Sequence, residues 1–116
     1  MSLTINVREV GNVVILDLSG SITLGDSLSV LREEMKDLLD AGHKNIVLNL
    51  AEVRYIDSSG LGQLVGSHAT VTNKGGKLKL LNLDKRVNEL MQVTKLLTVF
   101  ETFTSETAAL KSFEAK

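Results

Sequence analysis

One short segment of the sequence combines residue types that can do chemistry. Residues Tyr55–Gly62 read Tyr-Ile-Asp-Ser-Ser-Gly-Leu-Gly and hold a carboxylate, two hydroxyls and two glycines. The segment directly precedes an apolar helical pattern, so we expect it where a loop becomes a helix. A helix start has unpaired backbone N–H groups and the positive end of the helix dipole, which suit an anion. A phosphate on Ser58 fits this setting.

A plainer interpretation of Ser58 is a helix N-cap. Serine is a preferred N-cap residue, and caps are much commoner than modified or binding serines. The two glycines, Gly60 and Gly62, also admit two interpretations. Glycine is common in tight turns, and it lets a kinase or another partner protein approach the backbone closely. By residue type alone, the cap is the better supported role of Ser58.

Catalysis by Ser58 has little support elsewhere in the chain. A serine nucleophile needs a base that a third group orients. The two histidines are His43, expected at a helix end, and His68, expected to pack on or beside an apolar helical face. The Gly-x-Ser-x-Gly elbow, the P-loop pattern and clustered metal ligands are absent, so no cofactor is predicted. A small serine hydrolase is therefore only a minor alternative.

Composition and charge narrow the class of protein. The chain has 116 residues, 43% of them apolar, which suits one domain over residues 1–116 with its own core. A net charge of −1 and the absence of Trp leave neither a basic field nor a stacking platform for nucleic acid. There is no cysteine, no membrane-spanning apolar run and no signal-peptide pattern. We expect a cytoplasmic protein that binds another protein, without nucleic acid or membrane partners.

Hydrophobic periodicity indicates the elements that position the Tyr55–Gly62 segment. Alternation predicts a strand over Leu3–Val7, which a Gly-Asn turn joins to a second strand over Val13–Leu18 as a hairpin. Apolar residues at three- and four-residue spacing then predict a helix, and they are Leu28, Leu31, Met35, Leu38 and Leu39. Thr23 is a candidate N-cap of this helix, and Gly42 is placed to end it.

The rest of the chain alternates strands with helices. The further strands are expected at Asn45–Leu50, Lys77–Leu81 and Leu97–Phe103. The further helices are expected to carry the apolar stripe from Leu61 to Val71, and to cover Lys85–Thr94 and Ser105–Phe113. The order is β-β-α-β-α-β-α-β-α, and helices that regularly follow strands imply a mainly parallel sheet. The predicted class is α/β, with the opening hairpin as an antiparallel edge.

The sequence resembles the STAS domain of bacterial anti-sigma factor antagonists. The resemblance rests on Val47-Leu48-Asn49-Leu50 followed by Tyr55–Gly62, and on Gly75-Gly76-Lys77-Leu78 before the fourth strand. It runs from about Leu3 to Phe113 and implies the STAS fold, whose order of elements agrees with the one above. The most specific part is the Asp-Ser-Ser-Gly-Leu-Gly core. In this context a regulatory serine is favoured over a plain cap.

The resemblance implies regulation by partner switching. In that family, an anti-sigma factor that is also an ATP-dependent serine/threonine kinase binds the unphosphorylated antagonist and frees its sigma factor. The kinase phosphorylates the first hydroxyl after the Asp, here Ser58, and a PP2C-type phosphatase removes the phosphate. The kinase supplies the nucleotide and Mg²⁺, so the antagonist is not an enzyme and needs no cofactor. The implied partner-binding residues are Asp57, Ser59, Gly60, Leu61, Gly62 and Thr23.

One stretch departs from the family's pattern. Many antagonists carry Gly-Glu-Leu-Asp after the second strand, where this chain has Gly20-Ser21-Ile22-Thr23. Two hydroxyls thus replace an acidic pair in a loop expected beside the phosphorylation site. Thr23 is either a second phosphoacceptor or a helix cap, and the kinase's identity stays open.

Two other functions remain open at this point. STAS domains also serve as constitutive scaffold subunits of stress-signalling or lipid-transport complexes, which would make a permanent complex instead of a reversible one. A flavodoxin-like nucleotide binder has a similar order of elements, but the chain lacks the phosphate-loop chemistry. The sequence predicts no oligomeric state.

Overall fold

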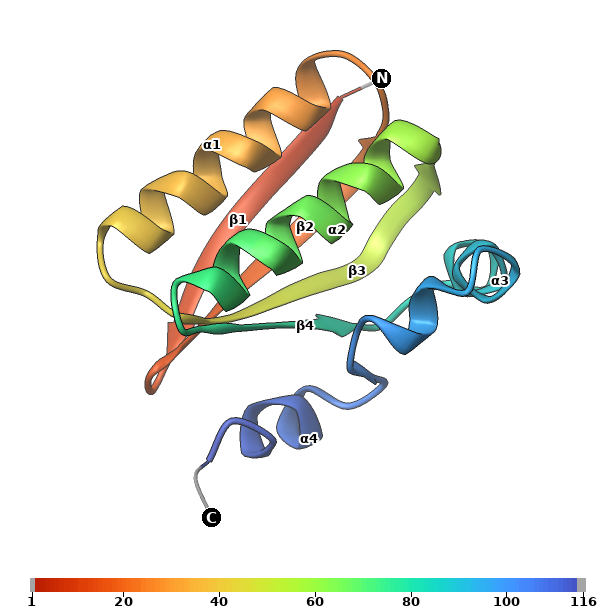
Figure 1. Ribbon diagram of the computed structural model, residues 1–116. Helices are drawn as coiled ribbons and strands as arrows, with labels where there is room; N and C mark the ends of the chain where they lie inside the picture. Colours follow the sequence, from red (N-terminus) through yellow and green to blue (C-terminus); the bar gives the residue numbers. More distant parts are fainter. Residues whose placement is uncertain (1, 115–116) are drawn as a thin grey trace.

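A five-stranded mixed sheet organises the chain, and helices lie on both of its faces (Figure 1). The computed structural model describes residues 2–114. Along the chain the elements are β1 (Leu3–Val10), β2 (Val13–Ile22), α1 (Asp26–Asp40), β3 (Asn45–Ile56), α2 (Ser58–Asn73), β4 (Lys77–Leu81), α3 (Lys85–Val93), the 3-10 turn η1 (Leu96–Thr98), β5 (Thr102–Phe103) and α4 (Glu106–Lys111).

The strands lie in the order β1-β2-β3-β4-β5 across the sheet. β1 pairs antiparallel with β2, and every later neighbour pairs in parallel. The prediction of a mainly parallel sheet with an antiparallel hairpin at its edge is therefore confirmed. Because β2, β3 and β4 run in one direction, their carboxyl ends meet at one end of the sheet. The loops that precede α1, α2 and α3 all begin there.

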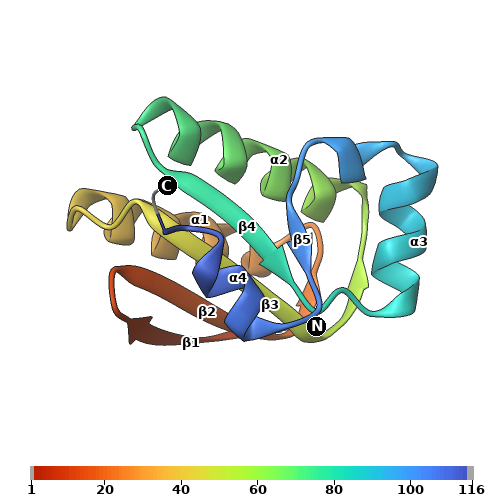
Figure 2. The same cartoon turned by 90° about the horizontal axis from the view of Figure 1, so that it is seen from below.

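The core has two layers, one on each face of the sheet. α1 and α2 lie side by side on one face, where Leu16, Leu48 and Leu80 from adjacent strands are fully buried (Figure 1). On the other face Ile15 and Val47 pack against α4, which Figure 2 shows in front of the sheet. Burial on both faces explains why β2 begins with an unbroken apolar run instead of an alternating one.

α1 ends at Asp40, and Gly42 closes its C-terminus as predicted. The Gly42 N–H donates to the Leu39 carbonyl at 3.0 Å, and the His43 N–H donates to the Leu38 carbonyl at 3.0 Å. This pair of bonds is a Schellman motif, which needs the left-handed backbone that Gly42 adopts with φ of +95°.

The prediction that Thr23 caps α1 is wrong. The N-cap position falls on Gly25, which has no side chain to offer the helix. The loop is closed instead by Ser27, whose hydroxyl accepts from the Thr23 N–H at 2.9 Å and donates to the Thr23 carbonyl at 2.6 Å. The Thr23 side chain itself makes no hydrogen bond with any residue from 2 to 114.

Four strand boundaries differ from the sequence-based expectation. β1 continues to Val10, three residues beyond the predicted end at Val7. β2 continues to Ile22 and β3 to Ile56, where these two residues are register partners. Pairing with a neighbouring strand thus extends both strands beyond their local apolar patterns. The expected strand over Leu97–Phe103 is wrong in its first half, because η1 occupies Leu96–Thr98. β5 pairs with β4 at only two positions, Leu80↔Thr102 and Leu81↔Phe103.

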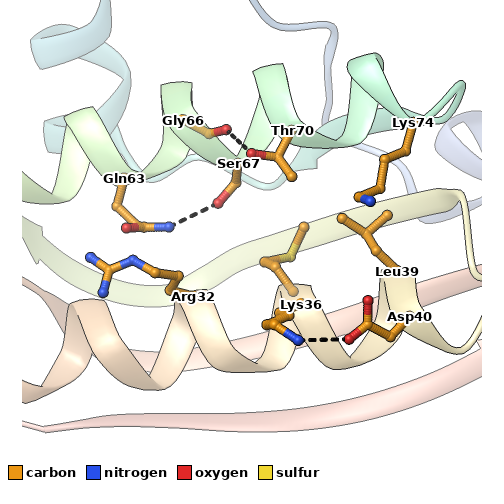
Figure 3. A pocket seen from close by; sticks show the side chains of 10 residues that line it. Arg32, Lys36, Leu39, Asp40, Gln63, Gly66, Ser67, Thr70 and Lys74 are labelled. Carbon is orange, nitrogen blue, oxygen red and sulfur yellow. Dashed lines mark hydrogen bonds and ion pairs between the residues drawn. The ribbon is translucent and has the colours of Figure 1, made fainter.

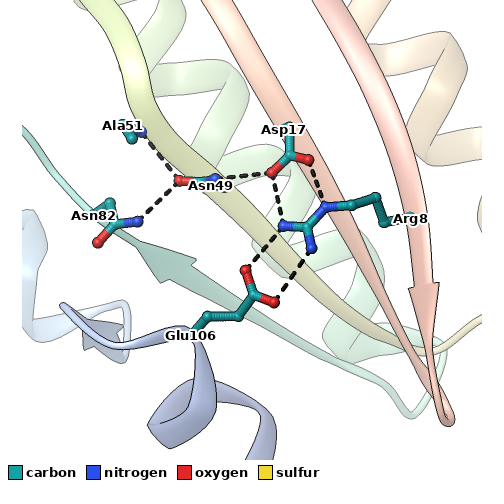
Figure 4. Close-up of polar contacts among 6 residues, drawn as sticks. All are labelled: Arg8, Asp17, Asn49, Ala51, Asn82 and Glu106. Atoms are coloured by element: carbon teal, nitrogen blue, oxygen red, sulfur yellow. Dashed lines mark hydrogen bonds and ion pairs between the residues drawn. The ribbon is translucent and has the colours of Figure 1, made fainter.

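A polar network fixes β1 to α4 on the second face of the sheet (Figure 4). The Arg8 guanidinium donates to Asp17 at 2.6 and 3.0 Å and to Glu106 at 2.9 and 3.2 Å. The Asn49 amide donates to Asp17 at 2.8 Å. Hydrogen bonds from Arg8 hold the pKa of the Asp17 carboxyl below its usual value.

Candidate functional site

Ser58 lies at the carboxyl end of the parallel strands, where β3 passes into α2. Ile56 ends β3 beside Ile22, the last residue of β2. The Asp57 N–H donates to the Ile22 carbonyl at 3.4 Å, so the two strand ends are held together directly. In open α/β sheets this end is the usual place for ligand and partner sites. The motif singled out in the sequence is therefore presented where binding is common.

Asp57 joins the two loops of the site through its carboxylate. One oxygen, Oδ1, accepts from the Gly60 N–H at 2.8 Å and caps α2. The other, Oδ2, accepts from the Leu24 N–H at 3.0 Å in the loop between β2 and α1. These backbone donors, Leu24 first and then Gly60, favour the ionised carboxylate and hold the pKa of Asp57 below its usual value.

Ser58 is the first residue of α2 and is exposed to solvent. Because Asp57 is the N-cap, the plain-cap interpretation of Ser58 is wrong. The Ser58 hydroxyl makes no hydrogen bond within the described part of the chain. The start of α2 therefore does not depend on this hydroxyl, since the Asp57 carboxylate provides the cap. Ser59 is half-buried behind Ser58.

Gly60 and Leu61 lie beneath the site and not on its surface. A Cβ atom at Gly60 would come within 2.0 Å of the Ile22 carbonyl oxygen, so the start of α2 rests on the backbone of β2. The Leu61 side chain is only 6% exposed and belongs to the core under α2. Both residues shape the site, but neither offers a side chain to a partner protein.

Gly62 and Thr23 complete the set of predicted residues. Gly62 is exposed, with nothing within 4 Å of the place where a Cβ atom would lie. Helical spacing puts it one turn beyond Ser58 on the same face of α2. Thr23 is half-buried in the loop that the Leu24–Asp57 hydrogen bond ties to α2. The structure thus brings the predicted residues into one region around Ser58.

A groove of about 450 Å³ opens beside Ser58, between the end of β3, the start of α2 and α3. Its lining consists of Arg54, Tyr55, Ile56, Asp57, Ser58, Arg86, Val87 and Leu90. The sequence motif did not reveal Arg54, Arg86 or Leu90. One signal was available: α3 follows a parallel strand, so its first residues must come to the same end of the sheet as the start of α2.

A second groove, of about 350 Å³, runs between α1 and α2 (Figure 3). Met35 and Leu39 form its apolar floor, and Arg32, Lys36 and Lys74 stand at its rim. The Lys36 ammonium is paired with Asp40 at 2.8 Å. Since Ser58 is not among its lining residues, this groove is separate from the site around the serine.

The two histidines of the chain do not come to Ser58. No histidine lines its groove, and the His68 ring packs edge-on against Phe100 at 5.3 Å, as predicted. Between residues 2 and 114, no group of three or more His, Cys, Asp or Glu side chains is placed to hold a metal ion. Within the same residues, no helix is long and apolar enough to cross a membrane.

Comparison with known proteins gives curated relatives of similar length. The anti-sigma-B factor antagonist of Bacillus subtilis is 34% identical over 101 residues, covering 87% of this chain and 91% of the relative. The anti-sigma F factor antagonist of Paenibacillus polymyxa is 28% identical over 115 residues, covering 98% and 97%. Both names describe regulatory proteins and not enzymes.

Solved structures share the fold, and a family model identifies it. A crystal structure from Thermotoga maritima matches with a TM-score of 0.86 at 23% identity, over 93% of this chain and 92% of that one. Phosphorylated SpoIIAA from Bacillus matches with a TM-score of 0.74 at 19% identity, over 96% and 100%. The model of the STAS domain matches residues 4–109. The chain therefore belongs to the STAS domain family.

Proposed function

We propose that this protein is an anti-sigma factor antagonist controlled by phosphorylation of Ser58. In its unphosphorylated form it binds an anti-sigma factor serine/threonine kinase, and phosphorylation releases it. A PP2C-type phosphatase restores the binding form. The proposal places the protein in the cytoplasm, where the kinase has ATP. The observation that carries it is the exposed Ser58 hydroxyl, which forms no hydrogen bond with residues 2–114, while Asp57 caps α2.

Ser58 is better placed than its hydroxyl neighbours to accept a phosphate. Ser59 and Thr23 are both half-buried, whereas Ser58 is exposed. A phosphate at the first position of α2 also meets the positive end of the helix dipole. The relatives named as anti-sigma factor antagonists, and the existence of a phosphorylated form of the structural neighbour SpoIIAA, support control by phosphorylation.

The physical basis of release is the charge that phosphorylation adds. A phosphoserine carries about −1.5 to −2 charges at neutral pH. A docked partner would have to remove water from this charge, and the ionised Asp57 next to it adds to the cost. A loss of about 3 kcal/mol of binding free energy weakens a complex more than a hundredfold. Ser58, Ser59, Gly62, Thr23 and the Asp57 backbone would form the contact, with Gly60 and Leu61 supporting it from below.

The test is a comparison of binding before and after phosphorylation. The kinase and ATP should add one phosphate, which fragmentation mass spectrometry should locate at Ser58. Titration calorimetry should then show binding by the unphosphorylated protein and by Ser58→Ala, and a loss of more than about a hundredfold after phosphorylation. Thr23→Val and Ser59→Ala are the matched controls, and both should still take up the phosphate.

Two results would contradict the proposal. Phosphate found only on Ser59 or Thr23 would show that the wrong hydroxyl has been chosen. Equal affinity of the phosphorylated and unphosphorylated protein for the kinase would show that there is no switch. In that case a stable complex of the native protein on size-exclusion chromatography would favour a constitutive scaffold subunit.

A further inference from the structure

Basic side chains gather next to Ser58, although the whole chain has a net charge of −1. Arg54 and Arg86 line the groove beside Ser58. Together with Lys85 and Asp84 they also line an adjoining hollow of about 430 Å³. The two hollows therefore share a pair of guanidinium groups that come from different elements, the end of β3 and the start of α3.

The neighbouring carboxylates of Asp57 and Asp84 accept hydrogen bonds from backbone N–H groups and do not pair with these cations. Asp57 accepts from two backbone N–H groups, and Asp84 caps α3 by accepting from the Val87 N–H at 2.9 Å. Arg54 meets Glu52 at 3.5 Å in an exposed pair, which is a weak interaction. In the described residues 2–114, the Arg86 side chain makes neither an ion pair nor a hydrogen bond. The guanidinium groups of Arg54 and Arg86 are therefore available to bind an anion.

Apolar side chains stand beside these cations. Tyr55 lines the groove and is 49% exposed. On α3, the spacing of Arg86, Leu90 and Val93 puts all three on one helical face. Val93 is 79% exposed, the largest exposed fraction among the large apolar side chains of the described residues. A basic groove with exposed apolar neighbours is complementary to a segment that carries both carboxylates and apolar side chains.

We propose that this groove binds an acidic, partly apolar segment of the partner kinase, and that phosphate on Ser58 displaces that segment by occupying Arg54 and Arg86. The inference rests on the proposed function and adds a mechanism to it. Guanidinium groups bind carboxylates and phosphates with the same bidentate geometry, so the two anions compete. The phosphate is attached to a residue that lines the groove, which gives it a high effective concentration there.

Competition and simple repulsion predict different behaviour of the arginines. If the phosphate only repels the partner, neutralising Arg54 and Arg86 leaves the effect of phosphorylation as large as before or larger. If the phosphate competes with the partner for the two arginines, removing them weakens the unphosphorylated complex. Phosphorylation then reduces the affinity by a smaller factor, because the contact that it would displace is already lost. The two models therefore differ in the coupling between the arginines and phosphorylation, which a double-mutant cycle measures.

The first experiment needs no kinase. The chain is prepared with phosphoserine at position 58, with and without Arg54→Gln and Arg86→Gln, and the phosphate is titrated by ³¹P NMR. Contact with the guanidiniums should lower the second phosphate pKa, whose usual value is about 6, and the double variant should have a higher pKa than the protein with both arginines. Arg32→Gln with Lys36→Gln, two substitutions in the α1–α2 groove, should leave the titration unchanged. An identical titration in all three proteins would overturn the inference.

The second experiment uses the kinase captured with Ser58→Ala as bait. The Arg54→Gln/Arg86→Gln protein should bind it at least about tenfold more weakly than wild type when unphosphorylated, and phosphorylation should then change its affinity by less than about tenfold. The α1–α2 groove control should behave as wild type. If wild type is released on phosphorylation but the double variant keeps full affinity and full release, the inference fails and the proposed function stands. If phosphorylation does not release wild type, the proposed function itself fails.

Discussion

At the scale of single residues, Gly60 and Gly62 differ in the space that surrounds them. Gly60 has no room for a side chain, because the Ile22 carbonyl lies where its Cβ atom would be. Gly62 has open space around it, so packing does not require a glycine there. A glycine inside a helix costs about 1 kcal/mol relative to alanine. Since the fold gains nothing from Gly62, its bare surface next to Ser58 is consistent with a role in partner contact.

The two glycines should therefore respond oppositely to alanine. Gly62→Ala should raise the free energy of unfolding by up to about 1 kcal/mol. Gly60→Ala should lower it by about 1–3 kcal/mol, because α2 has to move away from β2. Urea denaturation followed by circular dichroism measures both. A neutral Gly60→Ala variant would show that the contact with Ile22 relaxes without cost.

Asp57 should make the stability of the protein depend on pH in acid. Its folded pKa lies below the usual value of 3.8, because the folded protein stabilises the ionised form. The contribution is therefore present above that value and is lost as the pH falls through the folded pKa. Asp57→Asn should be less stable than wild type at pH 7, and the difference should shrink below about pH 4.

The measurement is the free energy of unfolding in urea between neutral and acid pH. Glu33→Gln, at an exposed position on α1, serves as the control for a general loss of charge. If the gap between wild type and Asp57→Asn were constant with pH, the hydrogen bonds from Leu24 and Gly60 would not depend on the charge of the carboxylate.

At the scale of elements, α4 depends on its contacts with the sheet. It has six residues, too few for an isolated helix to be stable in water. Ala109 is buried against the second face of the sheet, and Arg8 on β1 binds Glu106 in the first turn. At the C-terminal end of α4, the buried Lys79 ammonium from β4 donates to the Ser112 carbonyl at 3.1 Å. α4 is thus a helix that tertiary contacts hold in place.

Removing the Arg8 guanidinium should loosen α4 in particular. Arg8→Met should lower the free energy of unfolding by about 1 kcal/mol, because the pairs with Asp17 and Glu106 are partly exposed. Salt near 1 M should reduce this difference, since the Debye length is then only about 3 Å. Hydrogen exchange should quicken in residues 106–111 and stay unchanged in α2. Equal acceleration in both helices would mean that the network stabilises the whole sheet and not α4.

At the scale of the whole molecule, the proposed switch is separate from the fold. Ser58 is exposed and forms no hydrogen bond with the described residues, while Asp57 holds the helix start. A negative group at a helix N-terminus is neutral or stabilising by about 0.3–1 kcal/mol. The change in partner binding would then come from the local charge, without any refolding of the domain.

Phosphorylated protein should therefore keep its circular dichroism spectrum and its melting temperature. Thermal denaturation of the two forms tests this directly, and Gly60→Ala, which disturbs the same helix start, provides a destabilised reference. A large drop in melting temperature after phosphorylation would show that Ser58 does contribute to the packing of α2, and that release involves a change of structure.

The sequence by itself determined the order of the elements, the mainly parallel sheet and the place of the Tyr55–Gly62 segment between a strand and a helix. These features follow from short-range patterns. Apolar periodicity marks each helix and most strands, helices that follow strands imply parallel pairing, and the motif from Asp57 to Gly62 is contiguous. The closing of α1 by Gly42 was also predictable, because a helix C-terminus is decided within a few residues.

The tertiary structure alone decided what each residue of the site does. The Asp57 carboxylate ties the start of α2 to the loop before α1, because it also accepts from the Leu24 N–H, 33 residues away in the chain. Gly60 is buried because the end of β2 lies against it, and β3 continues to Ile56 because it has β2 to pair with. Arg54 and Arg86 share a groove because parallel strands bring their carboxyl ends together. All of these depend on distances between segments far apart in the chain, which local patterns do not contain.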